Sequence, residues 1–202
     1  MRLAYADPPY PGMAYLYREH KDYAGEVDHA ELIESLEVNY HGWALSTDER
    51  SLAYVLGHCP GGVRVCAWVR SNAPPFAPNP YPAWEPVIIK PARTRPVSVP
   101  SYFTSGVPNG KRQRDGLTGQ KPPGFCEWVL RCLGAREDDT LDDLFPGTGV
   151  MGEVWQRFRH QQTLFAVEVR GRGGQARENI LRRNHPTLEG LEPGTYVRER
   201  HV

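Results

Sequence analysis

The sequence has no excess of charge of either sign, because 24 lysine and arginine residues balance 24 aspartate and glutamate residues. A protein that binds nucleic acid draws its affinity for the backbone from several basic side chains that contact phosphates. The chain as a whole supplies no positive field of this kind. Contacts to a nucleic acid would therefore have to come from local groups of basic residues.

Long apolar runs and the usual metal-binding patterns are also missing. No apolar run approaches the ~18 residues that a membrane helix requires, and the stretch after Met1 and Arg2 is too short for a signal peptide. The four cysteines form no C-x-x-C pair, and the seven histidines form no H-x-x-x-H pattern. We therefore expect a cytoplasmic protein with reduced thiols and no metal, folded as a single domain over residues 1–202.

A segment near the start of the chain has the composition of an amine-binding turn. It follows the apolar run 3–6 and consists of Asp7, Pro8, Pro9 and Tyr10. The acid can accept a hydrogen bond from an NH₂ group, the prolines fix φ, and the ring offers a stacking face. The carbonyl of Pro8 would be a second acceptor. We expect a catalytic motif that holds a planar amine; the alternative is a proline-rich turn that only closes a strand.

A second motif has the composition of a strand-to-helix turn beside a ligand. Gly147 and Gly149 form a G-x-G pair shortly after Asp143. Glycines let the backbone approach a ligand closely, because no Cβ intervenes. About 20 residues further on, the run 164–169 is predicted to be a strand with Glu168 near its end, and an acid at that offset commonly binds ribose hydroxyls.

These motifs together resemble those of the methyltransferases that modify the exocyclic nitrogen of adenine. The segment 7–10 is similar to their catalytic motif, and the spacing D-x-F-x-G-x-G that starts at Asp143 is similar to their S-adenosylmethionine loop. A third element, the segment 120–122, resembles the Q-K-P element that precedes the cofactor loop. The catalytic motif comes first and the cofactor motif last, which resembles the permuted or beta arrangement of this family.

The resemblance implies a cofactor, a substrate and roles for particular residues. The cofactor would be S-adenosylmethionine, with Asp143 near its methionine amino group, Lys121 near its carboxylate end and Glu168 on its ribose. The substrate would be adenine in DNA, methylated at N6 after the base leaves the duplex. The partners implied are DNA and, because members of the permuted class often dimerise, a second copy of the chain. The full set of cofactor-binding residues implied is Lys121, Pro122, Asp143, Phe145, Gly147, Thr148, Gly149 and Glu168.

Prolines and basic side chains gather between residues 91 and 119. A stretch of this length without regular structure is usually functional or disordered, and aromatic rings such as Tyr102 and Phe103 among basic residues suit contact with a nucleic acid strand. We predict that this loop is a target-contacting insertion; the alternative is a surface excursion without a role. The residues predicted to contact phosphates are Arg93, Arg95, Lys111, Arg112 and Arg114.

Strand-like and helix-like segments alternate along the chain, which predicts an α/β fold. The resemblance specifies a Rossmann-like methyltransferase, with a mostly parallel, doubly wound sheet and helices on both faces. Ligands of such sheets bind at the carboxyl ends of the strands, where Asp7, Asp143 and Glu168 are expected. Strands are predicted at 2–6, 42–46, 63–70, 85–90, 140–144 and 164–169, and helices at 28–37, 48–57, 122–133 and 150–159.

Three functions stay open at this point. The first is an adenine-N6 methyltransferase of DNA, and the second is one of RNA. RNA enzymes of this kind more commonly have Trp in place of Tyr10, which favours DNA. The third is a non-catalytic subunit that binds nucleic acid with the same fold, against which the intact motifs argue. A cytosine-N4 enzyme would normally have Ser in place of Asp7.

Overall fold

The computed structural model describes residues 1–19, 23–71, 80–93, 98–106 and 120–171, with side chains as far as His160. The chain divides into two compact units, Met1–His160 and Gln161–Val202. The described part of the second unit, residues 161–171, is helical. The fold described below is that of the first unit.

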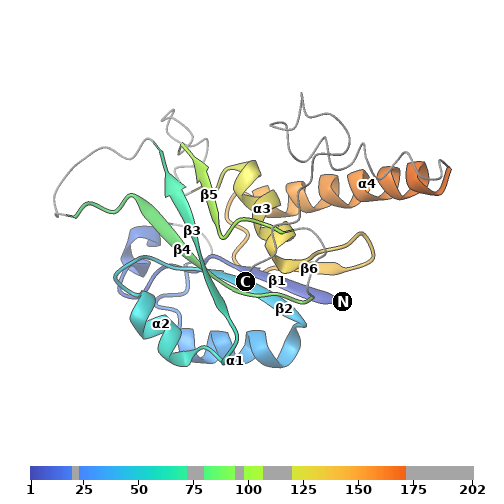
Figure 1. Cartoon of the computed structure of the whole chain (residues 1–202). Helices are drawn as coiled ribbons and strands as arrows, with labels where there is room; N and C mark the ends of the chain where they lie inside the picture. The colour runs from blue at the N-terminus through green and yellow to red at the C-terminus, as the bar shows by residue number, and fades with distance from the viewer. Residues whose placement is uncertain (20–22, 72–79, 94–97, 107–119, 172–202) are drawn as a thin grey trace, which may run out of the picture. The chain divides into compact units, whose positions relative to one another are not determined.

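A six-stranded sheet forms the centre of the first unit, in the order β5-β3-β4-β2-β1-β6 (Figure 1). Strand β1 pairs in parallel with β2 and β6, and β3 pairs in parallel with β5, whereas β4 is antiparallel to both its neighbours. The other described strands therefore share one direction, and their carboxyl ends meet at one end of the sheet, together with the start of β4. The strands are β1 (Arg2–Ala6), β2 (Gly42–Ser46), β3 (Arg64–Arg70), β4 (Trp84–Lys90), β5 (Tyr102–Ser105) and β6 (Thr140–Asp143).

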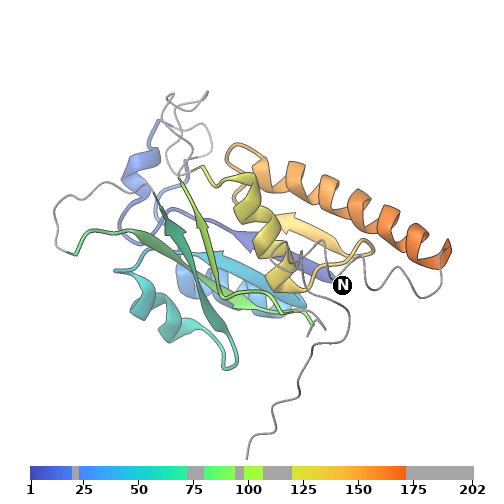
Figure 2. The same cartoon turned by 45° about the horizontal axis from the view of Figure 1, so that its top comes forward.

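Helices cover both faces of this sheet (Figure 2). Successive side chains of a strand point to opposite faces, so β1 contributes Leu3 and Tyr5 to one core and Ala4 and Ala6 to the other. The first core is closed by α3 (Pro123–Leu133) and the start of α4 (Val150–Gly171), and the second by α1 (His29–Asn39) and α2 (Leu52–His58). The two-faced arrangement expected for a doubly wound sheet is confirmed.

Most of the predicted elements are present with small shifts of their ends. Five of the predicted strands correspond to β1, β2, β3, β4 and β6. Helix α2 begins later than predicted, at Leu52, because the side chain of Asp48 accepts the Ser51 amide at 2.8 Å and holds a turn before the helix. A 3₁₀ turn, η1 (Ala14–Tyr17), was not predicted.

The prediction of a strand at 164–169 is wrong, because these residues continue helix α4. No glycine or proline occurs between Glu153 and Arg170, so nothing in the sequence ends the helix that begins at Val150. The premise that Glu168 lies at a strand end therefore fails. The side chain of Glu168 lies outside the described residues, and its role toward a ribose stays a sequence prediction.

The prediction that residues 91–119 lack regular structure is wrong for β5. This strand joins the sheet beside β3, and its Phe103 ring stacks on Trp128 with the ring centroids 6.0 Å apart. Phe103 therefore belongs to the core rather than to a nucleic-acid contact, whereas Tyr102 is 59% exposed. Aromatic and β-branched residues favour strand pairing even where prolines surround them.

Two further expectations concern thiols and membranes. The four cysteines are free, and Cys66 of β3 and Cys126 of α3 are buried in the same core. Within the described part of the chain, no helix is both long enough and apolar enough to cross a membrane.

Candidate active site

Three charged side chains gather at the carboxyl end of the sheet because of strand alternation. Asp7 continues the series of Leu3 and Tyr5, which face α3. On β4, Glu85 precedes Val87 and Ile89 on that same face, and it pairs across the sheet with Trp68 of β3. Side chains two residues apart on a strand share a face. Alternation therefore directs Asp7 and Glu85, and likewise Arg70 two residues after Trp68, toward the segment that leads into α3.

Lys121 occupies the centre of this group and is only 6% exposed. Its ammonium Nζ lies 3.0 Å from Asp7 Oδ1 and 3.2 Å from Glu85 Oε2, and it donates a hydrogen bond of 3.3 Å to the hydroxyl of Tyr10. An ammonium has three N–H donors, and each has an acceptor here. The two carboxylates and the hydroxyl therefore stabilise the charged form of the buried lysine.

Tyr10 and Arg70 complete the group around Glu85. The Tyr10 hydroxyl donates to Glu85 Oε2 at 2.9 Å, and the Arg70 guanidinium lies 3.4 Å from Glu85 Oε1. Both carboxylate oxygens of Glu85 are therefore engaged. The carboxylates of Asp7 and Glu85 and the cations of Lys121 and Arg70 balance in charge, and we call these four residues with Tyr10 the Lys121 cluster.

The pKa values within the cluster follow from burial and from these neighbours. Burial raises the pKa of Asp7, Lys121 opposes this effect, and the negative charge of Glu85 adds to it. Burial alone would lower the pKa of Lys121, but the carboxylates of Asp7 and Glu85 outweigh it and raise that pKa. The pKa of Tyr10 is raised by burial and by the same two carboxylates. Lys121 stays protonated, and Tyr10 keeps its hydroxyl proton.

A glycine turn follows β6 and lies beside the start of α3. Gly147 and Gly149 have φ values of +48° and +79°, which side chains with a Cβ rarely adopt. A Cβ added at Gly149 would meet nothing within 4 Å, and one added at Gly147 would meet only the Phe145 carbonyl oxygen at 4.0 Å. The backbone of this turn is therefore open to a ligand.

Polar contacts join the end of β6 to β1 and the glycine turn to the segment before α3. The amide of Leu144 donates to the Tyr5 carbonyl at 2.9 Å, and Gln120 Nε2 donates to Thr148 Oγ1 at 3.3 Å. Strands β1 and β6 are neighbours, with Tyr5 opposite Asp143. The three motifs identified in the sequence thus lie together at one end of the sheet.

Asp143 is the last residue of β6 and has an unusual environment. Its Oδ1 is buried and, among the described residues, has no hydrogen-bond partner. Burial raises the pKa of Asp143 to about 6, against a hydrogen bond from the Phe145 amide, and Asp7 adds to the rise. A buried carboxylate oxygen without a partner is rare, and here it suits the amino group of a ligand.

The other predicted cofactor residues take varied positions. Pro122 is the N-cap of α3, and Phe145 packs partly buried against the core formed with α1 and α2. Lys121 was expected near the carboxylate end of the cofactor, but its ammonium is paired with Asp7 and Glu85.

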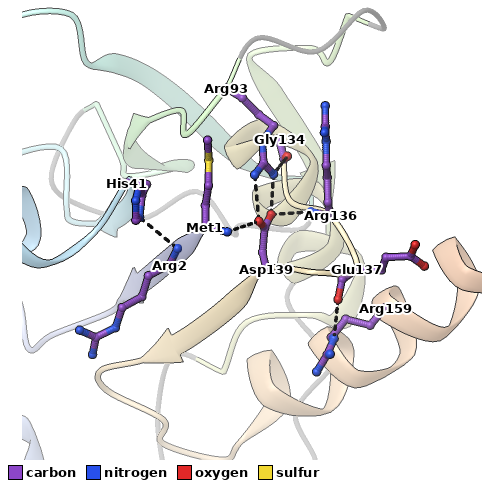
Figure 3. Close-up of polar contacts among 9 residues, drawn as sticks. All are labelled: Met1, Arg2, His41, Arg93, Gly134, Arg136, Glu137, Asp139 and Arg159. Atoms are coloured by element: carbon purple, nitrogen blue, oxygen red, sulfur yellow. Dashed lines mark hydrogen bonds and ion pairs between the residues drawn. The ribbon is translucent and has the colours of Figure 1, made fainter.

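Arg93 lies at the amino end of the sheet, where it meets Asp139 and the Gly134 carbonyl (Figure 3). Its guanidinium forms two hydrogen bonds to Asp139, of 2.5 and 2.9 Å, and a third of 3.0 Å to the Gly134 carbonyl. Its side chain is 14% exposed, so it holds the fold together and is not presented to a phosphate. The other predicted phosphate contacts lie outside the described residues: Arg95, Lys111, Arg112 and Arg114.

Sequence reasoning did not identify Glu85 and Arg70. The signal for Glu85 was an acid at the start of the apolar strand 85–90. Its position becomes informative only once β4 is known to be antiparallel, because that direction places the start of β4, rather than its end, at the carboxyl end of the sheet.

Comparisons with known proteins support the fold. No protein-family model and no curated protein matches the sequence. Among solved structures, that of M1.HpyAVI in complex with SAM is similar to this one, with 16% sequence identity and a TM-score of 0.51. The similar region covers 78% of this chain and 78% of the M1.HpyAVI chain. The structure of M1.HpyAVI without a named ligand is similar over 78% and 76%, with 15% identity and a TM-score of 0.50. The predicted Rossmann-like α/β fold is thereby confirmed.

Proposed function

We propose that this protein transfers a methyl group from S-adenosylmethionine to the N6 amino group of adenine in DNA. The observation that carries the proposal is the position of the segment 7–10 after β1, next to the open glycine turn after β6. The Rossmann-like fold supports it, because M1.HpyAVI, which shares this fold, has been solved with SAM.

The residues of the glycine turn fit the cofactor. The Oδ1 of Asp143, which has no partner in the described part of the chain, suits its amino group, and the space beside Gly147 and Gly149 admits a ligand against the backbone. Phe145 and Thr148 would complete the binding surface. Bound there, S-adenosylmethionine would supply a methyl group activated by attachment to a positively charged sulfur.

The segment 7–10 would hold the adenine amino group. Lys121 engages Oδ1 of Asp7, and among the described residues no donor contacts Oδ2, so this oxygen can accept one amino hydrogen. The Pro8 carbonyl would accept the other. Two acceptors favour a nitrogen whose lone pair is directed away from the ring, and Tyr10 would stack on the base. The methylated nitrogen then loses one proton to water, so Asp7 acts by positioning and electrostatics rather than as a strong base.

The choice of adenine and of DNA comes from the sequence. Asp7 favours adenine N6 over cytosine N4, and Tyr10 favours DNA over RNA. Lys111, Arg112 and Arg114 would supply phosphate contacts. Neutralising all three should lower the slope of log affinity against log salt by about three at most, near one for each phosphate that is no longer neutralised. Cofactor affinity should not change.

Transfer of a tritiated methyl group, followed by mass spectrometry of the nucleosides, tests the proposal directly. DNA, RNA and free nucleosides serve as acceptors. We expect N6-methyladenine in DNA. Label in RNA alone would change the substrate class, and N4-methylcytosine would overturn the assignment of the base. Calorimetric binding of S-adenosylmethionine without transfer to any acceptor would favour the non-catalytic subunit.

A further inference from the structure

Glu85 links three segments of the chain at the active site. Its Oε2 lies 3.2 Å from Lys121 Nζ and accepts from the Tyr10 hydroxyl at 2.9 Å, while its Oε1 lies 3.4 Å from Arg70. Its side chain is 15% exposed. No part of the methyl-transfer chemistry proposed above assigns a role to this carboxylate, although it contacts two residues beside the reacting centre.

The geometry around Lys121 shows what Glu85 contributes. The ammonium is shared between Asp7 Oδ1 at 3.0 Å, Glu85 Oε2 at 3.2 Å and the Tyr10 hydroxyl at 3.3 Å. If Glu85 lost its charge, Asp7 would be the one carboxylate left in the cluster to balance two cations, Lys121 and Arg70. Lys121 would then be drawn toward Asp7 and would compete for Oδ2, the oxygen that the substrate amine needs.

Glu85 also sets the orientation of the Tyr10 ring. The phenol donates a hydrogen bond to Glu85 and accepts one from Lys121, so two hydrogen bonds fix the hydroxyl. A fixed hydroxyl restricts rotation of the ring about its side-chain torsions. A ring that stacks on an extruded base contributes most when it is held in the stacking orientation beforehand.

We propose that Glu85 is a positioning residue of the methyl-transfer site, which holds the Lys121 ammonium between two carboxylates and orients Tyr10, so that Asp7 presents Oδ2 to the amine. This inference rests on the function proposed above. Glu85 acts through Lys121, Tyr10 and Asp7, and it does not itself contact the substrate.

The role has a consequence for pH dependence. The negative charge of Glu85 contributes to the raised pKa of Asp7, so its removal should lower that pKa. Methyl transfer requires ionised Asp7, and the acid limb of the kcat profile should then move to lower pH. The other titratable groups that influence Asp7, or are influenced by it, come from β1, the segment after it, β6, α3 and the segment before α3: Tyr5, Tyr10, Tyr17, Lys121, Cys126 and Asp143.

The kinetic test compares Glu85→Gln with Glu85→Asp and with a matched control, Glu127→Gln. Glu127 also forms an ion pair, with Arg131, but on the exposed surface of α3. Misplacement of a reacting group by about 1 Å can lower a rate ~10²-fold, so we expect Glu85→Gln to lower kcat by roughly 10- to 100-fold. The KM for S-adenosylmethionine should change little, and the acid limb should shift downward. Glu85→Asp should recover part of kcat, and Glu127→Gln should match the wild type.

A second measurement does not depend on the reaction. Site-resolved acetylation by acetic anhydride, read by mass spectrometry, reports the reactivity of each lysine. Glu85 contributes to the raised pKa of Lys121, so Lys121 should react faster in Glu85→Gln than in the wild type, relative to Lys90, whose partner Glu37 is unchanged.

The two measurements separate the inference from the proposed function. A folded Glu85→Gln variant with wild-type kcat and pH profile, or with unchanged Lys121 reactivity, would overturn the positioning role. A wild-type protein that transfers no methyl group would overturn the proposed function. In that case, faster acetylation of Lys121 in Glu85→Gln would still support Glu85 as the residue that holds it.

Discussion

Two aspartates at opposite ends of β6 have opposite electrostatic properties. Asp139 immediately precedes the strand and accepts hydrogen bonds from Arg93, the Met1 amino group and the Arg136 amide (Figure 3). These partners outweigh burial and lower its pKa to about 2. Asp143 ends the strand with a buried oxygen that has no partner among the described residues, and its pKa is raised to about 6.

Burial by itself raises the pKa of both carboxyls, so the difference comes from their partners. At the amino end of the sheet, the charge of Asp139 is matched and the aspartate stabilises the fold. At the carboxyl end, one oxygen of Asp143 lacks a hydrogen-bond donor among the described residues, which is destabilising unless a ligand supplies one. The carboxylate without a partner among the described residues therefore lies at the end of the sheet where we propose that the cofactor binds.

The largest effect on stability should come from removing the charge of Asp139, which is matched by its partners. Asp139→Asn removes a fully buried carboxylate from the partly buried Arg93 guanidinium, and breaking a buried pair costs about 3 kcal/mol. Urea unfolding at pH 7 measures the change in the free energy of unfolding. Cofactor affinity should stay at the wild-type value, because Asp139 lies at the end of β6 opposite the site.

Two controls accompany this variant. Glu127→Gln removes an exposed pair and should change the free energy of unfolding by less than about 0.5 kcal/mol. The folded pKa of Asp139 is depressed, so its stabilisation is present above the unfolded pKa of ~3.9 and is lost as pH falls toward about 2. The stability of Asp139→Asn should not show this decrease at low pH. Equal stability of variant and wild type at pH 7 would contradict the matched-charge account.

The second effect concerns Asp7, the carboxylate proposed to hold the adenine amino group. Asp7→Ala should lower methyl transfer by ~10²-fold, the usual scale for loss of a polar group directed at the reacting centre. Cofactor affinity should be nearly unchanged, because the glycine turn is intact. Single-turnover kinetics and calorimetry measure the two quantities. Wild-type turnover in this variant would leave the segment 7–10 as a structural turn.

The third effect concerns the open turn. Gly147→Val places a branched side chain at φ +48°, on the backbone that we propose lies against the cofactor. We expect cofactor affinity to fall at least ~10-fold, or about 1.4 kcal/mol. Gly62→Val has comparable backbone strain at φ +86°, just before β3 begins, at the amino end of the sheet. It should leave cofactor affinity unchanged, and equal losses in both variants would assign the effect to strain rather than to the site.

The smallest effect concerns the stability contributed by Asp143, at the other end of β6 from Asp139. The folded pKa of Asp143 is raised, so the associated stability is present below ~3.9 and is lost as pH rises through about 6. Asp143→Asn should therefore be more stable than the wild type at pH 8, by on the order of 1 kcal/mol because solvent screens part of the charge. The difference should disappear at pH 4, and cofactor affinity at pH 8 should fall. Thermal unfolding across this pH range checks the sign; lower stability of the variant at pH 8 would refute it.

Much of the fold could be predicted because its signals are local. The apolar runs 2–6 and 42–46 became β1 and β2, and Pro122 and Pro123 marked the start of α3. The strand β5 is short and lies among prolines, so its pairing with β3 was not visible. The run 164–169 has both strand-like and helical features, and continuity with α4 decided for the helix.

The candidate site was predictable only as far as its motifs. The segments 7–10, 120–122 and 143–149 lie together, as their order in the chain and the carboxyl-end rule indicated. The pairing of Lys121 with Asp7 and Glu85, and of Arg93 with Asp139, depends on contacts between residues distant in sequence. A local pattern contains no information about such partners.

The single reversed strand among those described, β4, has a consequence for how the sheet aligns. A slip of the strand by two residues would keep every side chain on its own face, but it would move Glu85 or Lys90 into the buried centre that Pro86 to Ile89 now occupy. A slip of that size displaces the strand ends by roughly 6.5 Å. It would separate Glu85 from Lys121 at one end and Lys90 from Glu37 at the other. The charged ends of β4 therefore help to fix its register, because a slip would bury one charge and separate both ion pairs.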